Sequence, residues 1–225
     1  VPLQIPNEDR QEYISEFGSE EPYNGNKGYF PNQYPNATYA AMITKLDQQI
    51  GEIRAKIKEL GLEENTMIIV TSDNGPTYVG GVDYDYFESS APFTNGFGRT
   101  KGFLYEGGIR VPMLVSWPGK IEKSTSDHIS VFYDIFPTLA ELVGASVPEN
   151  LDGKSFLPEL MGKEQEKHDY LYWEFPKPGG QQAVRMGNWK AVRQNIVKEN
   201  NLEIELYDLS KNILEQNNIA ADHPD

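Results

Sequence analysis

Two short apolar runs constrain the possible folds of this chain more than any other feature of its sequence. They are Thr66-Met67-Ile68-Ile69-Val70-Thr71 and Val111-Pro112-Met113-Leu114-Val115-Ser116, and neither alternates between apolar and polar side chains. Continuous runs of this kind are typical of strands that are covered on both faces, as in an α/β sheet. About 38 residues rich in Gly, Asp, Tyr and Ser separate the two runs. A loop this long inside a compact domain is usually functional.

The apolar periodicity on either side of these runs predicts two helices. Residues 38–60 carry apolar side chains at steps of three and four, with Thr38 as the N-cap and Gly61 as the residue that ends the helix. A second helix is expected to begin at Asp134 and to end at Gly144. The side chains expected to face a core are Tyr39, Met42, Ile43, Leu46, Ile50, Ile53, Ile57 and Leu60 in the first helix, and Leu139, Leu142 and Val143 in the second.

The beginning and the end of the sequence differ from its middle. The first 37 residues show no sustained period and are expected to form a long connection. After residue 151, short strand-like segments predict a small antiparallel sheet, with a hairpin turn at Gly187-Asn188. The strand candidates are residues 171–175, two short strands within 182–194, and 205–209. We therefore expect an α/β part over residues 1–150 and a small α+β subdomain over residues 151–225.

Charge and composition argue against several classes of protein. The chain has 20 Lys and Arg residues against 34 Asp and Glu residues, and its net charge of −14 argues against nucleic-acid binding. No apolar run approaches the roughly 20 residues of a membrane-spanning helix, so no membrane segment is expected in this chain. The chain contains no cysteine, which excludes disulfides and thiolate metal sites. The sequence begins with Val1-Pro2-Leu3-Gln4, which contains neither an initiator Met nor a signal-peptide pattern. It ends at residues 221–225 in the middle of a sequence pattern. We therefore interpret both ends as cuts.

A candidate metal site follows the first apolar run directly. Asp73-Asn74-Gly75 places a carboxylate and an amide oxygen beyond the carboxyl end of the predicted strand, where ligands bind in open α/β sheets. Both groups are hard oxygen donors, which suit Ca²⁺ or Mg²⁺. The same three residues are also common in turns, because each tolerates a positive φ. Taken alone, the tripeptide favours the turn.

Lys101 is the candidate catalytic residue. It lies 28 residues after Asp73 in the same long loop, within Gly98-Arg99-Thr100-Lys101-Gly102. Its ammonium could hold an anionic oxygen or neutralise charge on a departing oxygen. Composition alone favours a surface lysine beside a glycine turn. Arg185 and Lys190, which flank the predicted hairpin, are expected to be solvated.

Several segments, in the same order along the chain, resemble the C-terminal half of the type I, formylglycine-dependent sulfatases. They cover nearly the whole chain; each is weak alone, but together they make a specific pattern. The segments are Tyr39-Ala40-Ala41-Met42-Ile43 with Leu46-Asp47 and Gly51, Thr71-Ser72-Asp73-Asn74-Gly75, residues 101–112, Ser116-Trp117-Pro118-Gly119-Lys120, residues 134–139, Asp152-Gly153-Lys154-Ser155-Phe156, and Leu206-Tyr207-Asp208-Leu209 with Glu215 and Asn218.

The resemblance implies a fold, an activity and a site. The implied fold is the alkaline-phosphatase-like α/β sandwich with a smaller C-terminal antiparallel sheet. The implied activity is hydrolysis of a sulfate ester, carried by a sulfated sugar or an aryl group. Asp73 and Asn74 would be two ligands of one calcium ion, and Lys101 would contact the sulfate. The family also implies a periplasmic, secreted or lysosome-like compartment.

One part of the family pattern is missing from these 225 residues. The family makes a formylglycine nucleophile from Cys or Ser in a Cys/Ser-x-Pro-x-Arg motif. The chain has no cysteine, and the nearest serine match, Ser90-Ala91-Pro92-Phe93-Thr94, has Thr94 in place of the arginine and follows Asp73 instead of preceding it. We reject this match and expect the chain to be a fragment without the nucleophile, inactive alone.

Two other functions stay open from the sequence. A phosphodiesterase or phosphonate hydrolase of the same superfamily usually binds two transition metals through additional histidines, whereas the Asp73-Asn74 pair favours one hard cation. A calcium-dependent, non-catalytic glycan-binding protein would use the acidic loop for calcium alone. Trp173 and Glu174 could face a sugar, although an aromatic residue on a strand is more often core. The three histidines show no metal-ligand spacing and are expected to be structural or exposed: His128, His168 and His223.

Overall fold

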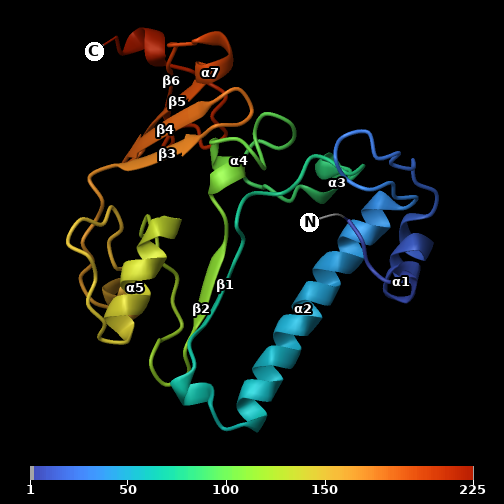
Figure 1. Ribbon diagram of the computed structural model, residues 1–225, viewed down its shortest axis with the longest axis horizontal. Helices are drawn as coiled ribbons and strands as arrows, with labels where there is room; N and C mark the ends of the chain where they lie inside the picture. The colour runs from blue at the N-terminus through green and yellow to red at the C-terminus, as the bar shows by residue number, and fades with distance from the viewer. Residues whose placement is uncertain (1–2, 225) are drawn as a thin grey trace.

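The computed structural model describes residues 3–224 and contains two separate sheets joined by helices and long loops (Figure 1). The helices are α1 (Asn7–Phe17), α2 (Pro35–Glu59), α3 (Tyr84–Phe87), α4 (Glu106–Ile109), α5 (Ile135–Leu142), α6 (Leu157–Leu160) and α7 (Ile196–Glu199). The strands are β1 (Ile68–Thr71), β2 (Met113–Ser116), β3 (Leu171–Phe175), β4 (Gln181–Met186), β5 (Trp189–Gln194) and β6 (Glu205–Asp208). Short 3₁₀ turns span Glu63–Asn65, Phe132–Asp134 and Ala220–Asp222. No helix within residues 3–224 combines the length and apolar character needed to cross a membrane.

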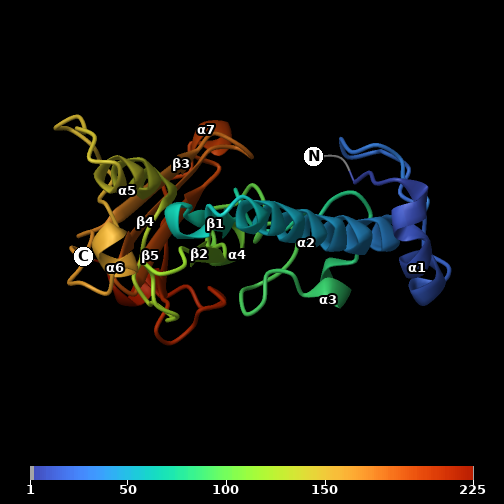
Figure 2. The same cartoon turned by 90° about the horizontal axis from the view of Figure 1, so that it is seen from below.

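The two apolar runs form the strands β1 and β2, as their sequence predicts. The strands pair antiparallel, from Ile68 opposite Ser116 to Thr71 opposite Met113. The expectation that both faces are covered is wrong for the described residues, because Leu114 is 68% exposed. The helix α2 overlaps the pair in Figure 2, but Figure 1 shows it apart from the two strands. The helices α2 and α5 do not bury their predicted apolar faces either. Exposed examples are Leu46, Ile53, Leu139 and Val143.

The helix α2 begins earlier than its sequence pattern predicts. It starts at Pro35 and not after Thr38, because proline suits the first turn of a helix. The carboxylate of Glu20 satisfies the first amides, since it accepts hydrogen bonds from the N–H groups of Asn36 at 2.6 Å and Ala37 at 3.0 Å. Thr38 is buried inside the helix instead.

The first 37 residues contain a helix that periodicity does not indicate. The helix α1 has no buried residue, so it lacks the apolar stripe by which an amphipathic helix is recognised in sequence. It lies beside α2, where the hydroxyls of Tyr13 and Thr44 are 2.5 Å apart and Lys45 Nζ is 3.4 Å from Asp9 Oδ1. The interpretation of this segment as a connection alone is therefore wrong.

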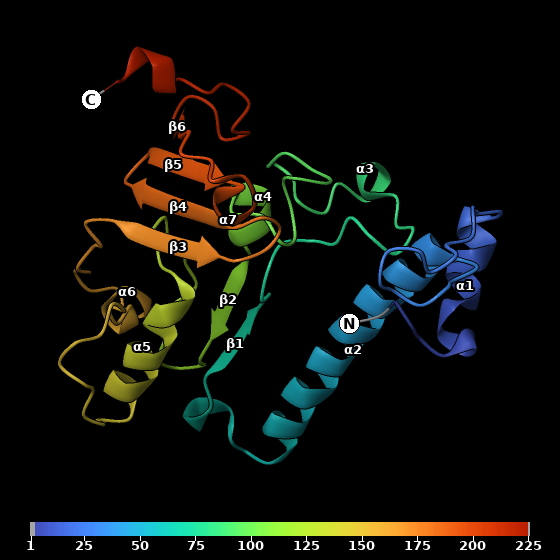
Figure 3. The same ribbon diagram turned by 45° about the horizontal axis from the view of Figure 1, so that its top comes forward.

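The C-terminal sheet is antiparallel with the strand order β3-β4-β5-β6, which confirms the prediction of a small sheet in this region (Figure 3). The strands β4 and β5 form the expected hairpin, closed by Met186 opposite Trp189. Gly187 has a φ of +56° in this turn, a conformation that favours glycine. The division of the chain at residue 150 stays a prediction.

A buried cluster joins the long loop to this sheet. The helix α4 lies beside β4 and β5 in Figure 3, and the residues just before it pack against the sheet. Burial of these side chains holds the loop segment that contains the predicted catalytic residue. The buried members are Phe103, Leu104 and Tyr105 from the loop, and Ala183, Val192, Tyr207 and Leu209 from the C-terminal region.

Lys190 is fully buried and neutralises two buried carboxylates. Its Nζ lies 2.8 Å from Glu106 Oε1 and 2.8 Å from Glu215 Oε1, and Arg185 NH1 lies 3.4 Å from Glu106 Oε2. The backbone N–H of Glu106 also donates to Glu215 Oε2 at 2.7 Å. The expectation that Arg185 and Lys190 are solvated is therefore wrong. Their partners lie far away in the sequence, and a buried cation persists where such partners surround it.

The two carboxylates respond in opposite directions to this environment. Burial acts to raise the pKa of Glu106, but the charges of Lys190, Arg185 and Arg110 outweigh it and hold this pKa below its usual range. At Glu215 burial dominates over the charge of Lys190, so its pKa lies above its usual range. Glu106 is therefore the carboxylate that keeps its charge as the pH falls.

We expect the Lys190→Met variant to be strongly destabilised. Removing the ammonium leaves Glu215 without its cation and Glu106 with only the guanidiniums of Arg185 and Arg110, and breaking a buried ion pair costs about 3–5 kcal/mol. The matched control is Lys198→Met, because Lys198 is exposed and its pairing with Glu199 spans 3.5 Å at the surface. Urea unfolding of both variants measures the difference. Equal stability of the two variants would contradict the role assigned to Lys190.

Candidate functional site

The chain bends at Asp73-Asn74-Gly75, one residue after β1, and we call this bend the Asp73-Asn74 turn. The hydroxyl of Ser72 donates to the carbonyl of Asn74 at 2.7 Å, and the N–H of Gly75 donates to the carbonyl of Gly108 at 2.8 Å. The side-chain amide of Asn74 donates from Nδ2 to the carbonyl of Gly75 at 2.9 Å, which leaves its Oδ1 available as an acceptor. Asp73 is exposed. The oxygen donors therefore lie in a bend, but none of the three residues has the positive φ on which the turn interpretation rested.

Lys101 is held beside this turn through its backbone. Its N–H donates to the carbonyl of Pro76 at 3.1 Å, and the side chain is half-buried. The next residue, Gly102, has a φ of +87°, where other residues are rarely found. The two motifs that lie 28 residues apart in the sequence therefore meet in space.

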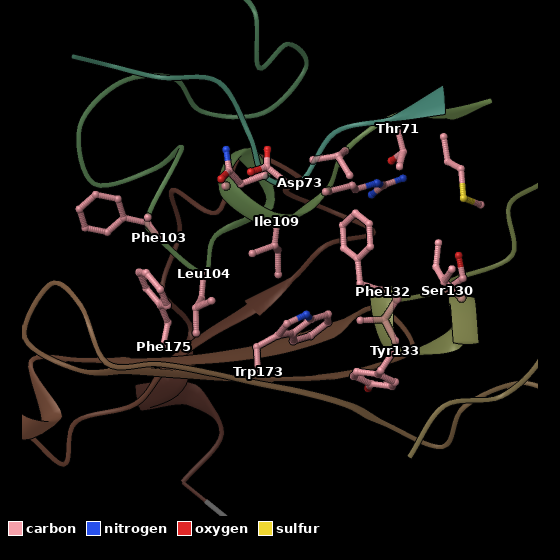
Figure 4. A pocket seen from close by; sticks show the side chains of 18 of the residues that line it. Thr71, Asp73, Phe103, Leu104, Ile109, Ser130, Phe132, Tyr133, Trp173 and Phe175 are labelled. Atoms are coloured by element: carbon pink, nitrogen blue, oxygen red, sulfur yellow. The ribbon is translucent and has the colours of Figure 1, made fainter. Parts of the chain in front are cut away.

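Two cavities adjoin these residues. Lys101 and Asn74 line a cavity of about 620 Å³ together with Arg110. Asp73 and Asn74 line a second, more apolar cavity of about 430 Å³, which Figure 4 shows between the end of β1 and the ring of Trp173 on β3. Asn74 borders both cavities, so an ion held by Asp73 and Asn74 would lie at the boundary between them. Neither of these two cavities is lined by both Asp73 and Lys101.

Arg110 is a residue at this site that sequence reasoning missed. It borders both cavities, and its guanidinium is 3.3 Å from Glu106 Oε2 and 5.3 Å from the ring centroid of Phe93. Its side chain is 48% exposed, so a cation remains accessible at the mouth of the site. The signal was present in the sequence, because Arg110 belongs to the segment 101–112 that carries the resemblance.

Ser90 is not suited to act as a nucleophile. It is buried, and its hydroxyl donates to Asn95 Oδ1 at 3.1 Å. No base within hydrogen-bond distance accompanies it among residues 3–224. This geometry agrees with the rejection of Ser90-Ala91-Pro92-Phe93-Thr94 as the nucleophile motif.

The chemistry of Asp73 and Asn74 fits a hard cation but does not complete its coordination. A carboxylate and an amide oxygen suit calcium, which takes six to eight oxygen ligands. Residues 3–224 contain no cluster of three or more His, Asp or Glu side chains that could hold a metal ion. Further ligands would therefore come from water, the substrate or other residues.

The remaining candidates from the sequence have structural contacts. His168 Nε2 lies 2.8 Å from Asp134 Oδ1, and His223 packs edge-on against Trp189 with ring centroids 5.1 Å apart. Burial lowers the pKa of His128, which is half-buried. Trp173 is partly buried: it packs against the buried cluster and also lines the cavity that Asp73 borders, so its interpretation as core or as a sugar contact stays open.

Glycines allow the three backbone segments of the site to approach one another. A Cβ on Gly75 would lie 1.9 Å from the carbonyl oxygen of Gly107, and a Cβ on Gly108 would lie 2.0 Å from the carbonyl oxygen of Phe103. Neither contact is physically possible without backbone movement. The Gly107-Gly108 pair in α4 thus packs directly on the Asp73-Asn74 turn and on the Lys101 segment.

Comparison with known proteins gives consistent matches over the chain. The model of the family described as Sulfatase matches residues 5–145, and that of N-sulphoglucosamine sulphohydrolase, C-terminal, matches residues 97–224. An N-acetylgalactosamine-6-O-sulfatase of Bacteroides thetaiotaomicron is 31% identical over 206 residues, which is 84% of this chain and 39% of that protein. Human arylsulfatase A is 34% identical over 167 residues, 72% of this chain and 31% of that protein.

The fold of this chain is also similar to that of a solved structure. The crystal structure of Ps i-CgsB in complex with k-i-k-neocarrahexaose superposes on the whole of this chain and on 44% of its own, with a TM-score of 0.74 and 28% identity. The chain therefore spans less than half the length of these relatives.

We expect Gly75→Ala to destabilise the chain and Gly51→Ala to stabilise it slightly. The first substitution drives a methyl group into the carbonyl of Gly107, which costs about 1–3 kcal/mol by overpacking. The second is a matched control, because Gly51 is in α2 with nothing within 4 Å of its Cβ position, and alanine is favoured in a helix by up to about 1 kcal/mol. The free energy of unfolding of each variant is the measurement. A Gly75→Ala variant as stable as the parent would show that the turn does not need this close packing.

Proposed function

The chain belongs to the sulfatase family, and on that premise we propose that it forms the Lys101 side of the active site of an enzyme that hydrolyses sulfate esters. The observation that carries the proposal is the hydrogen bond from the N–H of Lys101 to the carbonyl of Pro76. It brings the lysine next to the Asp73-Asn74 turn, and Lys101 and Asn74 line one cavity. Asp73 lines the neighbouring cavity, which Asn74 also borders.

Each residue has a distinct task in this proposal. Asp73 and Asn74 would hold a calcium ion through a carboxylate oxygen and Oδ1, and the ion would supply positive charge to the sulfate oxygens. Lys101 would donate hydrogen bonds to sulfate oxygens or to the departing oxygen. An ammonium suits this task, because its three donors match a tetrahedral anion that has no single planar face. Arg110 adds a second cation at the mouth of the cavity.

The nucleophile is proposed to lie outside these 225 residues. The chain contains no cysteine, and Ser90 lacks the motif and is hydrogen-bonded to Asn95. A formylglycine made from a Cys or Ser elsewhere would supply the nucleophilic oxygen. The chain would then be catalytically active only as part of a larger enzyme.

Sulfated glycans are the proposed substrates. One relative is named as a sulfatase of N-acetylgalactosamine, and one solved relative is complexed with a neocarrahexaose. The similarity to arylsulfatase A also makes an aryl sulfate a practical assay substrate. Turnover of a phosphonate monoester in preference to both would favour the hydrolase of phosphorus esters that the sequence left open.

We expect Lys101→Ala in the native enzyme to lower kcat by about 10²–10³, the range for the loss of one donor to charge that develops in the transition state. KM should change less, and Lys101→Arg should rescue activity in part, because it restores the charge but not the shape. Steady-state kinetics on a chromogenic aryl sulfate give both constants. The matched control is Lys120→Ala, an exposed lysine in a neighbouring loop. Unchanged kcat with a raised KM would mean that the lysine only assists binding.

We also expect Asp73→Ala to weaken calcium binding strongly and Asn74→Ala to weaken it less. The first variant loses a charged ligand, whereas the second loses a neutral one. Titration calorimetry with Ca²⁺ measures both affinities without any turnover. Equal affinities in the parent and both variants would mean that the Asp73-Asn74-Gly75 segment is a turn only.

A further inference from the structure

Gln181 is a buried side chain whose amide group bonds only to backbone atoms among residues 3–224. It stands at the start of β4 and is 1% exposed. Its Nε2 donates to the carbonyls of Gly102 at 2.8 Å and Lys177 at 2.7 Å, and its Oε1 accepts from the N–H of Leu104 at 3.2 Å. Both hydrogens of the amide and its oxygen are therefore used.

Two of these hydrogen bonds are made with Gly102 and Leu104, which follow Lys101 closely in the sequence. Within residues 3–224, Gln181 provides the hydrogen bond to the carbonyl of Gly102 and the one to the N–H of Leu104. On the other side, the N–H of Lys101 is bonded to the carbonyl of Pro76. The backbone around Lys101 is thus held between the Asp73-Asn74 turn and the C-terminal sheet.

Another hydrogen bond holds the same stretch of backbone. The N–H of Phe103 donates to the carbonyl of Thr100 at 3.0 Å, so the peptide that follows Gly102 is bonded at its N–H end within the loop. Phe103 and Leu104 pack in the buried cluster, and Arg99 NH1 donates to the carbonyl of Glu215 at 3.0 Å. Apolar packing is non-directional. Gln181 adds a directional hydrogen bond at the carbonyl end of this peptide and connects it to the C-terminal sheet.

We propose that Gln181 is a positioning residue, which sets the direction in which Lys101 presents its ammonium to the sulfate group. The inference rests on the proposed function of Lys101 and extends the active site to the C-terminal sheet. Gln181 acts through the backbone of Gly102 and Leu104, next to Lys101, and does not touch the substrate. Misplacement of a catalytic group by about 1 Å can cost 10²-fold in rate, so a remote amide can matter for turnover.

The neighbouring Gln182 offers a matched control. It is on the same strand, it is half-buried, and its Nε2 reaches Glu174 Oε2 at 3.4 Å instead of the Lys101 segment. In the native enzyme, Gln181→Leu is expected to lower kcat on a chromogenic aryl sulfate by about 10- to 10²-fold, with a smaller change in KM. Gln182→Leu is expected to leave both constants within about twofold of the parent.

A double-mutant cycle separates positioning from a general structural effect. If Gln181 acts through Lys101, then Gln181→Leu has little further effect on kcat in a Lys101→Ala enzyme, because the ammonium it orients is gone. Effects that multiply independently would overturn the inference while the proposed function stands. An unchanged kcat in Lys101→Ala alone would overturn the proposed function, and this inference with it.

The Gln181→Glu variant tests the same point if Gln181→Leu does not fold. Its carboxylate still accepts from the N–H of Leu104 but faces the carbonyls of Gly102 and Lys177 without a donor. A protonated Glu has one O–H donor, so the ratio of its kcat to that of the parent should rise as the pH falls. The rise should be absent in the Lys101→Ala background. A ratio independent of pH, or the same rise without Lys101, would overturn the inference.

Discussion

The buried contact of Lys190 with Glu106 and Glu215 is the interaction on which the rest of the structure depends. It joins β5, α4 and the segment near the C-terminus at one point, with both oxygens 2.8 Å from the ammonium. Glu106 begins α4, whose Gly107-Gly108 pair packs on the turn after β1. The position of the turn therefore depends on a cation that comes from another sheet. This arrangement is costly to desolvate, and its value lies in fixing one geometry.

The site itself is assembled mainly from backbone contacts. The carbonyl of Pro76 accepts a hydrogen bond from the N–H of Lys101, and the carbonyl of Gly108 accepts one from the N–H of Gly75. Of the polar side-chain atoms of Asn74, Nδ2 is used in this packing, since it donates to the carbonyl of Gly75. Within residues 3–224, Asn74 Oδ1 and the Lys101 ammonium make no hydrogen bond and are open to a ligand. This freedom supports the proposed sulfatase site, together with the family membership.

The sequence predicted the helices and strands that have strong local patterns. It did not predict side-chain contacts between residues that lie far apart in the chain. The strands β1 and β2, most of α2 and the β4–β5 hairpin followed from periodicity and turn residues. The burial of Lys190 did not, because its partner Glu106 lies 84 residues away and nothing local distinguishes a buried lysine from a solvated one. Gln181 escaped notice for the same reason, since its bonds reach back to the loop residues Gly102 and Leu104. Local position and spacing singled out Asp73 and Lys101 as candidates, but only the family pattern favoured a functional role over a turn and a surface lysine, and that role stays a prediction.

Because Lys190 is fully buried, salt affects its ion pairs differently from the charges on the surface of this protein. Mobile ions cannot reach a fully buried pair, whereas an exposed pair such as Lys56–Glu59 is screened over about 8 Å at 0.15 M salt. The ion pairs of Lys190 that connect α4 to the C-terminal sheet are therefore insensitive to ionic strength. The chain carries a net charge of −14, which repels anions at long range, and salt weakens that repulsion. Changes in salinity would then act on the approach of anions to the surface and leave the buried contacts of Lys190 unchanged.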